Sequence, residues 1–114
     1  MQEIGQAWAD ELKKGGVTGV ILPATWGTGT RSGAALAKEL EREKIPTALI
    51  TCLPDVAKDI GANRIVNNKA GHFHHPFGEP NMTKEAEEVW RLGAVRAALE
   101  ALKTPVKVPT VFEY

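Results

Sequence analysis

The sequence has little of three features that mark whole classes of protein: cysteine, an excess of charge of one sign, and long apolar runs. Its single cysteine, Cys52, excludes an internal disulfide framework and is typical of a reducing cytoplasm. The 14 Lys and Arg residues balance 14 Asp and Glu residues, which leaves no electrostatic footprint for nucleic acid or an anionic membrane. No apolar stretch approaches the ~20 residues of a membrane span, and residues 1–14 do not resemble a signal peptide. We therefore expect a cytoplasmic protein.

The 114 residues predict a single domain, residues 1–114, in which helical patterns alternate with strand patterns. Short apolar runs predict strands at 17–24, 45–52 and 63–68, followed by an extended tail at 104–114. Helical spacing is carried by Ile4, Trp8 and Leu12, by Leu36 and Leu40, and by a stripe of Val89, Leu92, Val95, Leu99 and Leu102. Strands that alternate with helices pair in parallel through right-handed crossovers. The pattern predicts an α/β fold, a small three-layer domain with a parallel sheet of about three to four strands flanked by helices.

Three segments follow the predicted strands directly. They are the Gly-rich turn at 25–33, the residues 52–54, and a His-rich loop that begins after Asn67. Ligands of open α/β sheets bind at the carboxyl ends of the strands. We therefore expect these three segments to meet at a site on that edge of the sheet.

The segment ATWGTGTRSGA, residues 24–34, has the composition of a strand-to-helix turn that binds an anion. Glycines allow backbone conformations that other residues avoid, and the N–H groups at a helix start favour a carboxylate or another anion. The groups that suit an anion are the glycines Gly27, Gly29 and Gly33, the hydroxyls of Thr28, Thr30 and Ser32, and the guanidinium of Arg31. The spacing matches neither the dinucleotide-binding fingerprint nor a phosphate-binding loop with its lysine. From spacing alone, a turn that only caps the helix is an equal alternative.

The same segment resembles the active-site motif of the selenoprotein B family, the substrate-activating components of glycine, sarcosine and betaine reductases and the related D-proline reductase subunit. That motif is selenocysteine-Gly-Thr-Cys-Thr-Arg, then Cys or a small residue, then Gly. This chain has Trp-Gly-Thr-Gly-Thr-Arg-Ser-Gly at 26–33. The resemblance continues through AKELEREKIPTALITC, GANRIV, HPFGEPN and TVFE, in order along nearly the whole chain. The family's proteins are longer, and the chain resembles their C-terminal catalytic region.

The resemblance implies the reductive cleavage of the C–N bond of a small amino acid or amine, in a complex with other reductase subunits. A partner subunit holds the amine substrate, the selenolate attacks the α-carbon, and the amine leaves. A nearby cysteine then resolves the adduct as a selenenyl sulfide. A selenolate suits this chemistry because it is ionised at neutral pH, whereas a thiolate needs a lowered pKa. The resemblance implies no cofactor in this chain other than selenocysteine at position 26.

Trp26 falls on the selenocysteine position, and the chain departs from the motif at two further positions. Gly29 and Ser32 stand where the family often has cysteines. Selenocysteine is encoded by UGA and tryptophan by UGG, so Trp26 is an evolved replacement, a deliberate substitution or a product of UGA readthrough. Readthrough does not account for Gly29 and Ser32. Cys52 is a candidate for a distant resolving thiol, although a buried apolar role is the more common one for a lone cysteine.

The His-rich loop adds one candidate to the site. His75 is placed to donate a proton to the leaving amine, because imidazole titrates near neutrality. His72 and His74 would share one face of an extended segment, but the resemblance includes no metal, and we expect none.

Two functions follow from these observations. The first is a component of a reductase complex with its reactive group at position 26. The alternative is a non-catalytic subunit for anion binding or complex assembly that has lost the redox residues. A parallel sheet this small leaves apolar surface uncovered, so we also expect a homo-oligomer with the N-terminal helix or residues 105–114 at the contact.

Overall fold

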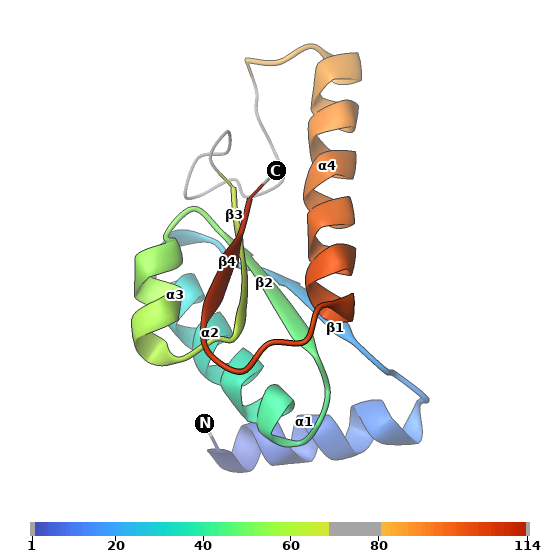
Figure 1. Cartoon of the computed structure of the whole chain (residues 1–114), viewed down its shortest axis with the longest axis vertical. Coiled ribbons are helices and arrows are strands. Elements are labelled where there is room, and N and C mark those ends of the chain that lie inside the picture. The colour runs from blue at the N-terminus through green and yellow to red at the C-terminus, as the bar shows by residue number, and fades with distance from the viewer. Residues whose placement is uncertain (1, 69–80, 114) are drawn as a thin grey trace.

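The computed structural model describes residues 2–68 and 81–113 and has an α/β fold (Figure 1). Its elements are α1 (Gln2–Lys14), β1 (Val20–Pro23), α2 (Trp26–Arg42), β2 (Thr47–Thr51), α3 (Pro54–Ile60), β3 (Arg64–Asn67), α4 (Lys84–Lys103) and β4 (Thr110–Phe112). The four strands form one parallel sheet in the order β1-β2-β3-β4. The predicted parallel sheet flanked by helices is therefore confirmed, and the extended tail supplies the fourth strand.

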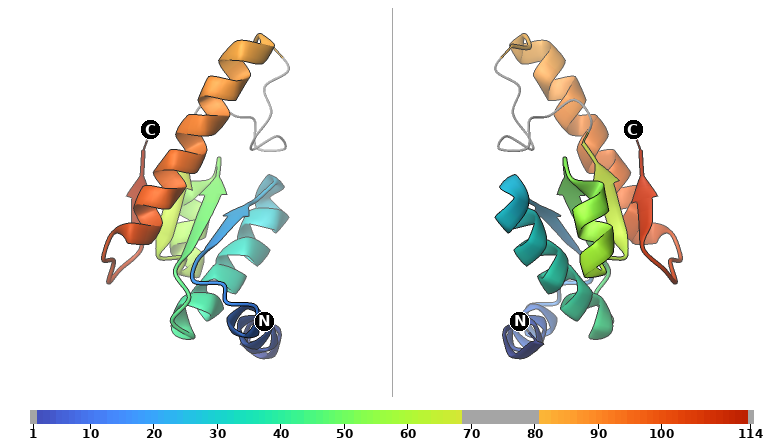
Figure 2. Two further views of the ribbon diagram at one scale, coloured as in Figure 1. Left: turned by 90° about the vertical axis from the view of Figure 1, so that its right-hand side faces the viewer. Right: turned by 90° about the vertical axis from the view of Figure 1, so that its left-hand side faces the viewer.

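Helices cover both faces of the sheet (Figure 2). α2 and α3 pack on one face, over a buried cluster of Ala24, Ala34, Ala37, Leu49, Ala57, Ala62 and Ile65. α4 packs on the opposite face, over Ala48, Ile50, Val66, Ala98 and Ala101. Because both of its faces are covered, β2 is buried at all five positions, as expected for a central parallel strand. α1 packs on α2 and lies across the edge at which the strands begin (Figure 1).

The three crossover connections do not share one hand. The strands follow one another across the sheet in chain order, while α2 and α3 lie on one face and α4 on the other. Figure 2 shows right-handed connections through α2 and α3 and a left-handed connection from β3 through α4 to β4. The prediction of right-handed crossovers was therefore wrong for the last connection. The right-handed preference comes from a twisted strand that feeds a helix directly, and the long segment 68–83 separates β3 from α4.

The buried face of α4 is made of alanine. Ala94, Ala98 and Ala101 are buried, whereas Val89, Leu92 and Leu99 are exposed. The apolar stripe that predicted this helix therefore does not mark its buried face at these three residues. Alanine lets the helix axis approach the sheet closely, and β2 and β3 already supply the larger side chains Ile50 and Val66 to that layer.

On α1, too, small residues are buried and large apolar residues are exposed. Gly5 and Ala9 are buried against α2, while Ile4 and Trp8 are exposed. A Cβ atom on Gly5 would lie only 2.4 Å from the Cβ of Glu39, so the close contact between the two helices requires glycine there. Of the expected stripe of the first helix, Leu12 alone packs against the buried cluster of Ala9, Leu40 and Ile45.

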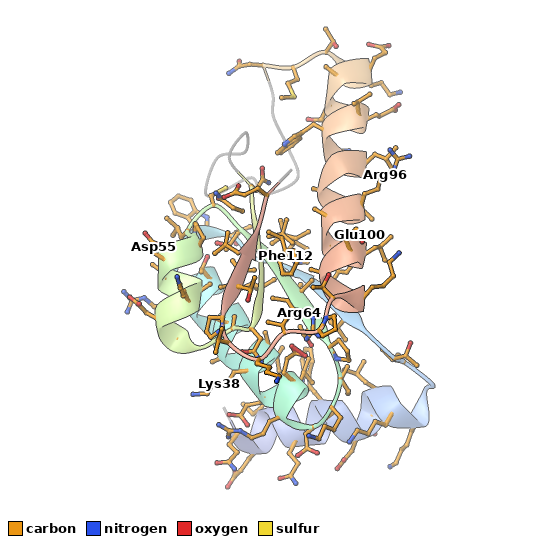
Figure 3. The ribbon with its side chains drawn as sticks, viewed as in Figure 1. Lys38, Asp55, Arg64, Arg96, Glu100 and Phe112 are labelled. Atoms are coloured by element: carbon orange, nitrogen blue, oxygen red, sulfur yellow. The ribbon has the colours of Figure 1, made fainter. Side chains whose placement is uncertain are left out.

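Arg64 joins three elements at the edge where the strands begin (Figure 3). Its Nε donates to the carbonyl oxygen of Ala101 at 2.7 Å, and its second guanidinium nitrogen donates to the carbonyl of Thr104 at 3.1 Å. Its remaining nitrogen pairs with the carboxylate of Glu41 on α2. The guanidinium therefore satisfies the last carbonyls of α4 and links the two helix layers across the end of the sheet.

Candidate functional site

The connection between β1 and α2 is short and has an unusual backbone. β1 ends at Pro23 and α2 begins at Trp26, so only two residues separate them. Trp26 has φ of +58°, in the left-handed region that non-glycine residues rarely adopt. Lys44 also has a positive φ, but it follows the end of α2, where this conformation is common. A helix that starts with a left-handed tryptophan is not explained by ordinary capping.

Trp26 combines this backbone conformation with exposure to solvent. The residue is 54% exposed although it stands at the start of α2, directly after β1. A sharp strand-to-helix turn with a strained residue is the device by which α/β enzymes present a reactive side chain above the sheet. Position 26 therefore has the geometry of a position that presents a side chain to a ligand.

The glycines of this segment do not serve the backbone role predicted for them. Residues 26–42 are helical, whereas the sequence predicted a turn at 25–33 and a helix from about residue 32. Among the described glycines only Gly16 and Gly61 have positive φ. Gly33 is required for packing, because a Cβ there would lie 2.9 Å from Cδ1 of Leu49. Contact of α2 with β2 thus outweighs the helix-breaking tendency of glycine.

Two other glycines leave room beside Trp26. A Cβ built on Gly27 meets no atom within 4 Å, and one on Gly29 lies an ordinary 3.4 Å from the Thr25 hydroxyl. Residues 26 and 29 stand one helical turn apart, so side chains at these positions are neighbours. The space for a side chain at position 29 matches the motif in which a cysteine stands there.

The hydroxyls of the segment divide between solvent and interior. Thr28 and Ser32 are exposed, but Thr30 is buried and its hydroxyl lies 2.8 Å from that of Thr51 at the end of β2. The Thr51 hydroxyl also accepts from the N–H of Leu53 at 3.0 Å. This buried pair joins the first turns of α2 to the start of α3.

Thr51 was missed by the sequence analysis, and so was Asn68. Asn68 is buried, and its N–H donates to the Thr51 carbonyl at 3.0 Å. Polar residues at the end of a buried strand were the available signal, since Thr51 follows the apolar residues of β2 and Asn68 follows those of β3. The carboxyl ends of these strands are thereby held together.

Cys52 lies at this same edge, directly after β2. Its side chain is half-buried, and burial raises the pKa of the thiol above its ordinary value. Trp26 and Thr30 are one helical turn apart, and Thr30 contacts Thr51, the neighbour of Cys52. The fold therefore brings position 26 and Cys52 to one end of the sheet, but it leaves the thiol protonated at neutral pH.

Arg31 occupies a different side of α2. It is exposed, and five residues along a helix place it about 7.5 Å further along the axis and about 140° around from Trp26. The predicted anion cradle assumed a loop that folds Arg31 back toward the first N–H groups. Because the segment is helical, the free N–H groups at the start of α2 and Arg31 are separated along the helix.

At the far side of the same edge, Asn67 contacts Glu113. The Asn67 side-chain amide donates to the two carboxylate oxygens of Glu113 at 3.3 and 3.2 Å, which ties the end of β3 to the end of β4. The predicted proton donor His75, with His72 and His74, lies outside the described residues. Within residues 2–68 and 81–113, no three His, Cys, Asp or Glu side chains cluster in a way that could hold a metal ion.

Two grooves lie away from position 26. One of about 240 Å³ runs between α4 and β4 and includes Arg96, Glu100 and Phe112 (Figure 3). The other, of about 280 Å³, lies near the edge at which the strands begin and is lined by Lys38, Glu41, Arg42, Gly61 and Asn63. Trp26 lines neither groove and is exposed on the surface.

The fold and the site define an α/β domain with a parallel sheet whose carboxyl edge presents one strained, exposed residue and also carries a cysteine. Comparison with known proteins supports the resemblance found in the sequence. The glycine reductase complex component B subunit gamma of Carboxydothermus hydrogenoformans is 44% identical over 111 residues, which are 97% of this chain and 25% of that protein. The betaine reductase complex component B subunit beta of Peptoclostridium acidaminophilum is 41% identical over 90% of this chain and 23% of that protein.

A more distant relative is matched over a larger share of its own length. The D-proline reductase subunit gamma of Acetoanaerobium sticklandii is 31% identical over 99% of this chain and 46% of that protein. The chain therefore spans about a quarter of the glycine and betaine reductase relatives and under half of the D-proline reductase one. No family model matches the chain, and no solved structure gives a significant match. Of the helices in the described part of the chain, none is long and apolar enough to cross a bilayer.

Proposed function

We propose that this domain carries the attacking residue of a reductase complex that cleaves the C–N bond of a small amino acid or amine. The other subunits of such a complex are its partners, and a reducing cytoplasm is its compartment. The observation that carries the proposal is the left-handed, outward-facing residue at position 26. Relatives named as reductase components, similar over nearly the whole chain, support the reaction class.

The reaction requires a selenolate or thiolate at position 26. Its attack on the α-carbon forms a C–Se or C–S bond as the C–N bond breaks, and the amine leaves with a proton. A thiolate then attacks the selenium or sulfur, the carbon fragment leaves with a proton, and a selenenyl sulfide or disulfide remains. An external dithiol reduces that bond and supplies the two electrons. Trp26 supports none of these steps, so the proposal refers to a protein with selenocysteine or cysteine at this position.

The start of α2 provides the activation that this residue needs. The free N–H groups and the dipole of a helix N-terminus stabilise an anion, and they lower the pKa of a thiol placed there. Cys52 is the thiol nearest along the sheet edge, but its raised pKa disfavours the thiolate. A cysteine at position 29, where a side chain fits, would be the better resolving group.

The first test introduces a thiol by Trp26→Cys in a Cys52→Ser background. The matched control is Trp8→Cys, because Trp8 is 52% exposed but lies within α1. We expect the pH midpoint of iodoacetamide alkylation to lie about one unit lower for the position-26 thiol than for the control. Equal midpoints would show that the start of α2 does not activate a thiol.

The second test concerns the reaction itself. Trp26→Sec or the double substitution Trp26→Cys with Gly29→Cys, mixed with the partner subunits of a related complex, is expected to give amine-dependent oxidation of a dithiol. The protein with Trp26 is the control and should be inactive. The codon at position 26 of the gene decides the origin of Trp26, since UGA with a selenocysteine insertion element identifies the native residue.

One observation favours a second function. Tryptophan, glycine and serine stand at positions 26, 29 and 32, so all three redox positions of the motif lack sulfur and selenium. A subunit for anion binding or complex assembly would retain the helix N-terminus and the exposed hydroxyl of Thr28, with the exposed Arg31 further along the helix. Calorimetric titration with glycine, betaine, proline and sulfate tests this function. Arg31→Ala should weaken binding by about 1.5–3 kcal/mol if the guanidinium contacts the anion, and unchanged affinity would make Arg31 structural.

A further inference from the structure

The outward face of α4 carries large apolar side chains at regular intervals. Val89 is 72% exposed, Leu92 47% and Leu99 48%. Figure 2 shows that the N-terminal half of this helix extends beyond the end of the sheet. Single exposed apolar residues are common on protein surfaces, but a row of them along one helix marks an interaction site.

The spacing of this row is that of a helix–helix interface. Leu92 and Leu99 are seven residues apart and therefore lie within about 20° of each other around the helix. Half-buried Val95 lies between them and gives a 3-4 spacing, which is typical of the seam between two packed helices. Leu102 is not part of this row, because it packs against the buried cluster on the sheet side of α4. We call the three residues Leu92, Val95 and Leu99 the α4 seam.

The charges beside the α4 seam are arranged so that it fits a copy of itself. Lys84, Glu85, Glu87, Glu88 and Arg91 give the N-terminal half of α4, residues 84–93, a net charge of −1. Arg96, Glu100 and Lys103 give residues 94–103 a net charge of +1, and Lys103 pairs with Glu100 at 3.0 Å. In an antiparallel pair of helices the acidic end of one faces the basic end of the other. The two helix dipoles then also point in opposite directions, which is favourable. A parallel pair would place like charges together.

We propose that two copies of this chain associate through antiparallel packing of their α4 seams. The alignment that faces Leu92 of one copy with Leu99 of the other also faces Glu88 with Lys103, because both pairs of residue numbers add up to 191. Each pair occurs twice by the two-fold symmetry of the interface. The proposal is independent of the chemistry at position 26.

This interface differs from the two contacts expected from the sequence. α1 exposes only Ile4 and Trp8 as large apolar residues, four positions apart, which is one turn of contact. In the tail, Val108 is a single exposed apolar residue between two prolines. The α4 seam extends over two turns, and the two halves of its helix have opposite net charges, so it is the better surface for a second copy.

Sedimentation equilibrium of the whole chain at low and high salt tests the proposal. We expect a dimer, and we expect Leu92→Ser to raise the dissociation constant by about tenfold or more, as for a central interface residue. Val108→Ser is the matched control, because it removes an exposed apolar side chain outside the seam and should leave the dissociation constant unchanged. Circular dichroism confirms that each variant keeps its helices.

A charge exchange tests the antiparallel alignment. Glu88→Lys and Lys103→Glu should each weaken the dimer by about tenfold at low salt, and the double substitution should restore it. In a Cys52→Ser background, a mixture of the Leu92→Cys and Leu99→Cys variants should form the intermolecular disulfide faster than either variant alone. A monomer at all concentrations would overturn the proposal, because the seam would then be a surface for another protein or for another segment of a longer chain. A dimer that is lost with Trp8→Ser and unchanged by the seam variants would also overturn it.

Discussion

The two edges of the sheet differ in how their polar groups are held. At the edge where the strands begin, the side chains of Arg64 and Glu41 are each 10% exposed, and the guanidinium donates to a carboxylate and two carbonyls. At the edge where the strands end, Trp26 is exposed in a strained conformation and Cys52 is half-buried with a raised pKa. The first edge holds a buried ion pair, and the second has an exposed tryptophan in a strained conformation beside a buried pair of hydroxyls.

This difference separates stability from function. The buried pair of Arg64 and Glu41 joins α2 to the end of α4, and the guanidinium is occupied by the carboxylate and two carbonyls. A strained residue costs about 1–3 kcal/mol and persists only where the surrounding structure enforces it, as at functional sites. Binding at the carboxyl edge is also the general rule for parallel α/β sheets. The comparison therefore assigns the candidate site to the edge that is less well stabilised.

The largest expected effect on stability comes from a substitution at the edge where the strands begin. Arg64→Leu removes the cationic partner of the Glu41 carboxylate and one donor from each of the carbonyls of Ala101 and Thr104. We expect the free energy of unfolding to fall by about 3–5 kcal/mol, measured by urea denaturation. The matched control is Arg42→Leu, whose side chain is 51% exposed and pairs with Glu39, and which should cost about 1 kcal/mol or less. Similar losses for the two variants would contradict the role given to Arg64.

The next effect concerns the buried hydroxyls at the opposite edge. Thr51→Val leaves the Thr30 hydroxyl and the Leu53 N–H without their partner, so we expect a loss of about 1–3 kcal/mol in the free energy of unfolding. Thr30→Val should lower the free energy of unfolding much less in the Thr51→Val background than in the unchanged protein, because the hydrogen bond between the two hydroxyls is already absent. Thr110→Val removes a more exposed hydroxyl and serves as the control, with a change within about 0.5 kcal/mol. Strict additivity of the two valine substitutions would show that the hydroxyls are not coupled.

The sequence predicted the elements better than it predicted their surfaces. Alternating strand and helix patterns were enough to predict the parallel sheet, and the motif was enough to single out position 26. The glycines of residues 27–33 were taken for a turn because glycine disfavours helices, but residues 26–42 are helical, and Gly33 lies where α2 packs closely on Leu49. The exposed side of α4 could not be predicted, because helical spacing locates an apolar face without telling whether a sheet or another molecule covers it. The link between Thr30 and Thr51 depends on residues 21 positions apart, which periodicity does not relate.

The strain at Trp26 predicts an inverted preference between glycine and alanine. At position 26 the left-handed backbone favours glycine, so Trp26→Gly should be more stable than Trp26→Ala by about 1 kcal/mol. Trp8 is also an exposed tryptophan but lies within α1, where Trp8→Ala should be more stable than Trp8→Gly by about 0.5–1 kcal/mol. Thermal or urea denaturation of the four variants gives both differences. If alanine is preferred at both positions, Trp26 is not strained, and the geometric argument for position 26 fails.

The smallest effect is a change in the titration of Cys52. Burial raises the pKa of this thiol, so at a given pH the folded protein has less thiolate than an exposed cysteine has. Because the thiolate is the species that reacts, the rate of iodoacetamide alkylation should rise with pH through a midpoint above the ordinary value of about 8.5. The control is the same protein in urea, where the unfolded chain should show the ordinary midpoint. A folded-state midpoint at or below that of the unfolded chain would mean that the sheet edge activates Cys52, and it would make this thiol a better resolving group than its burial allows.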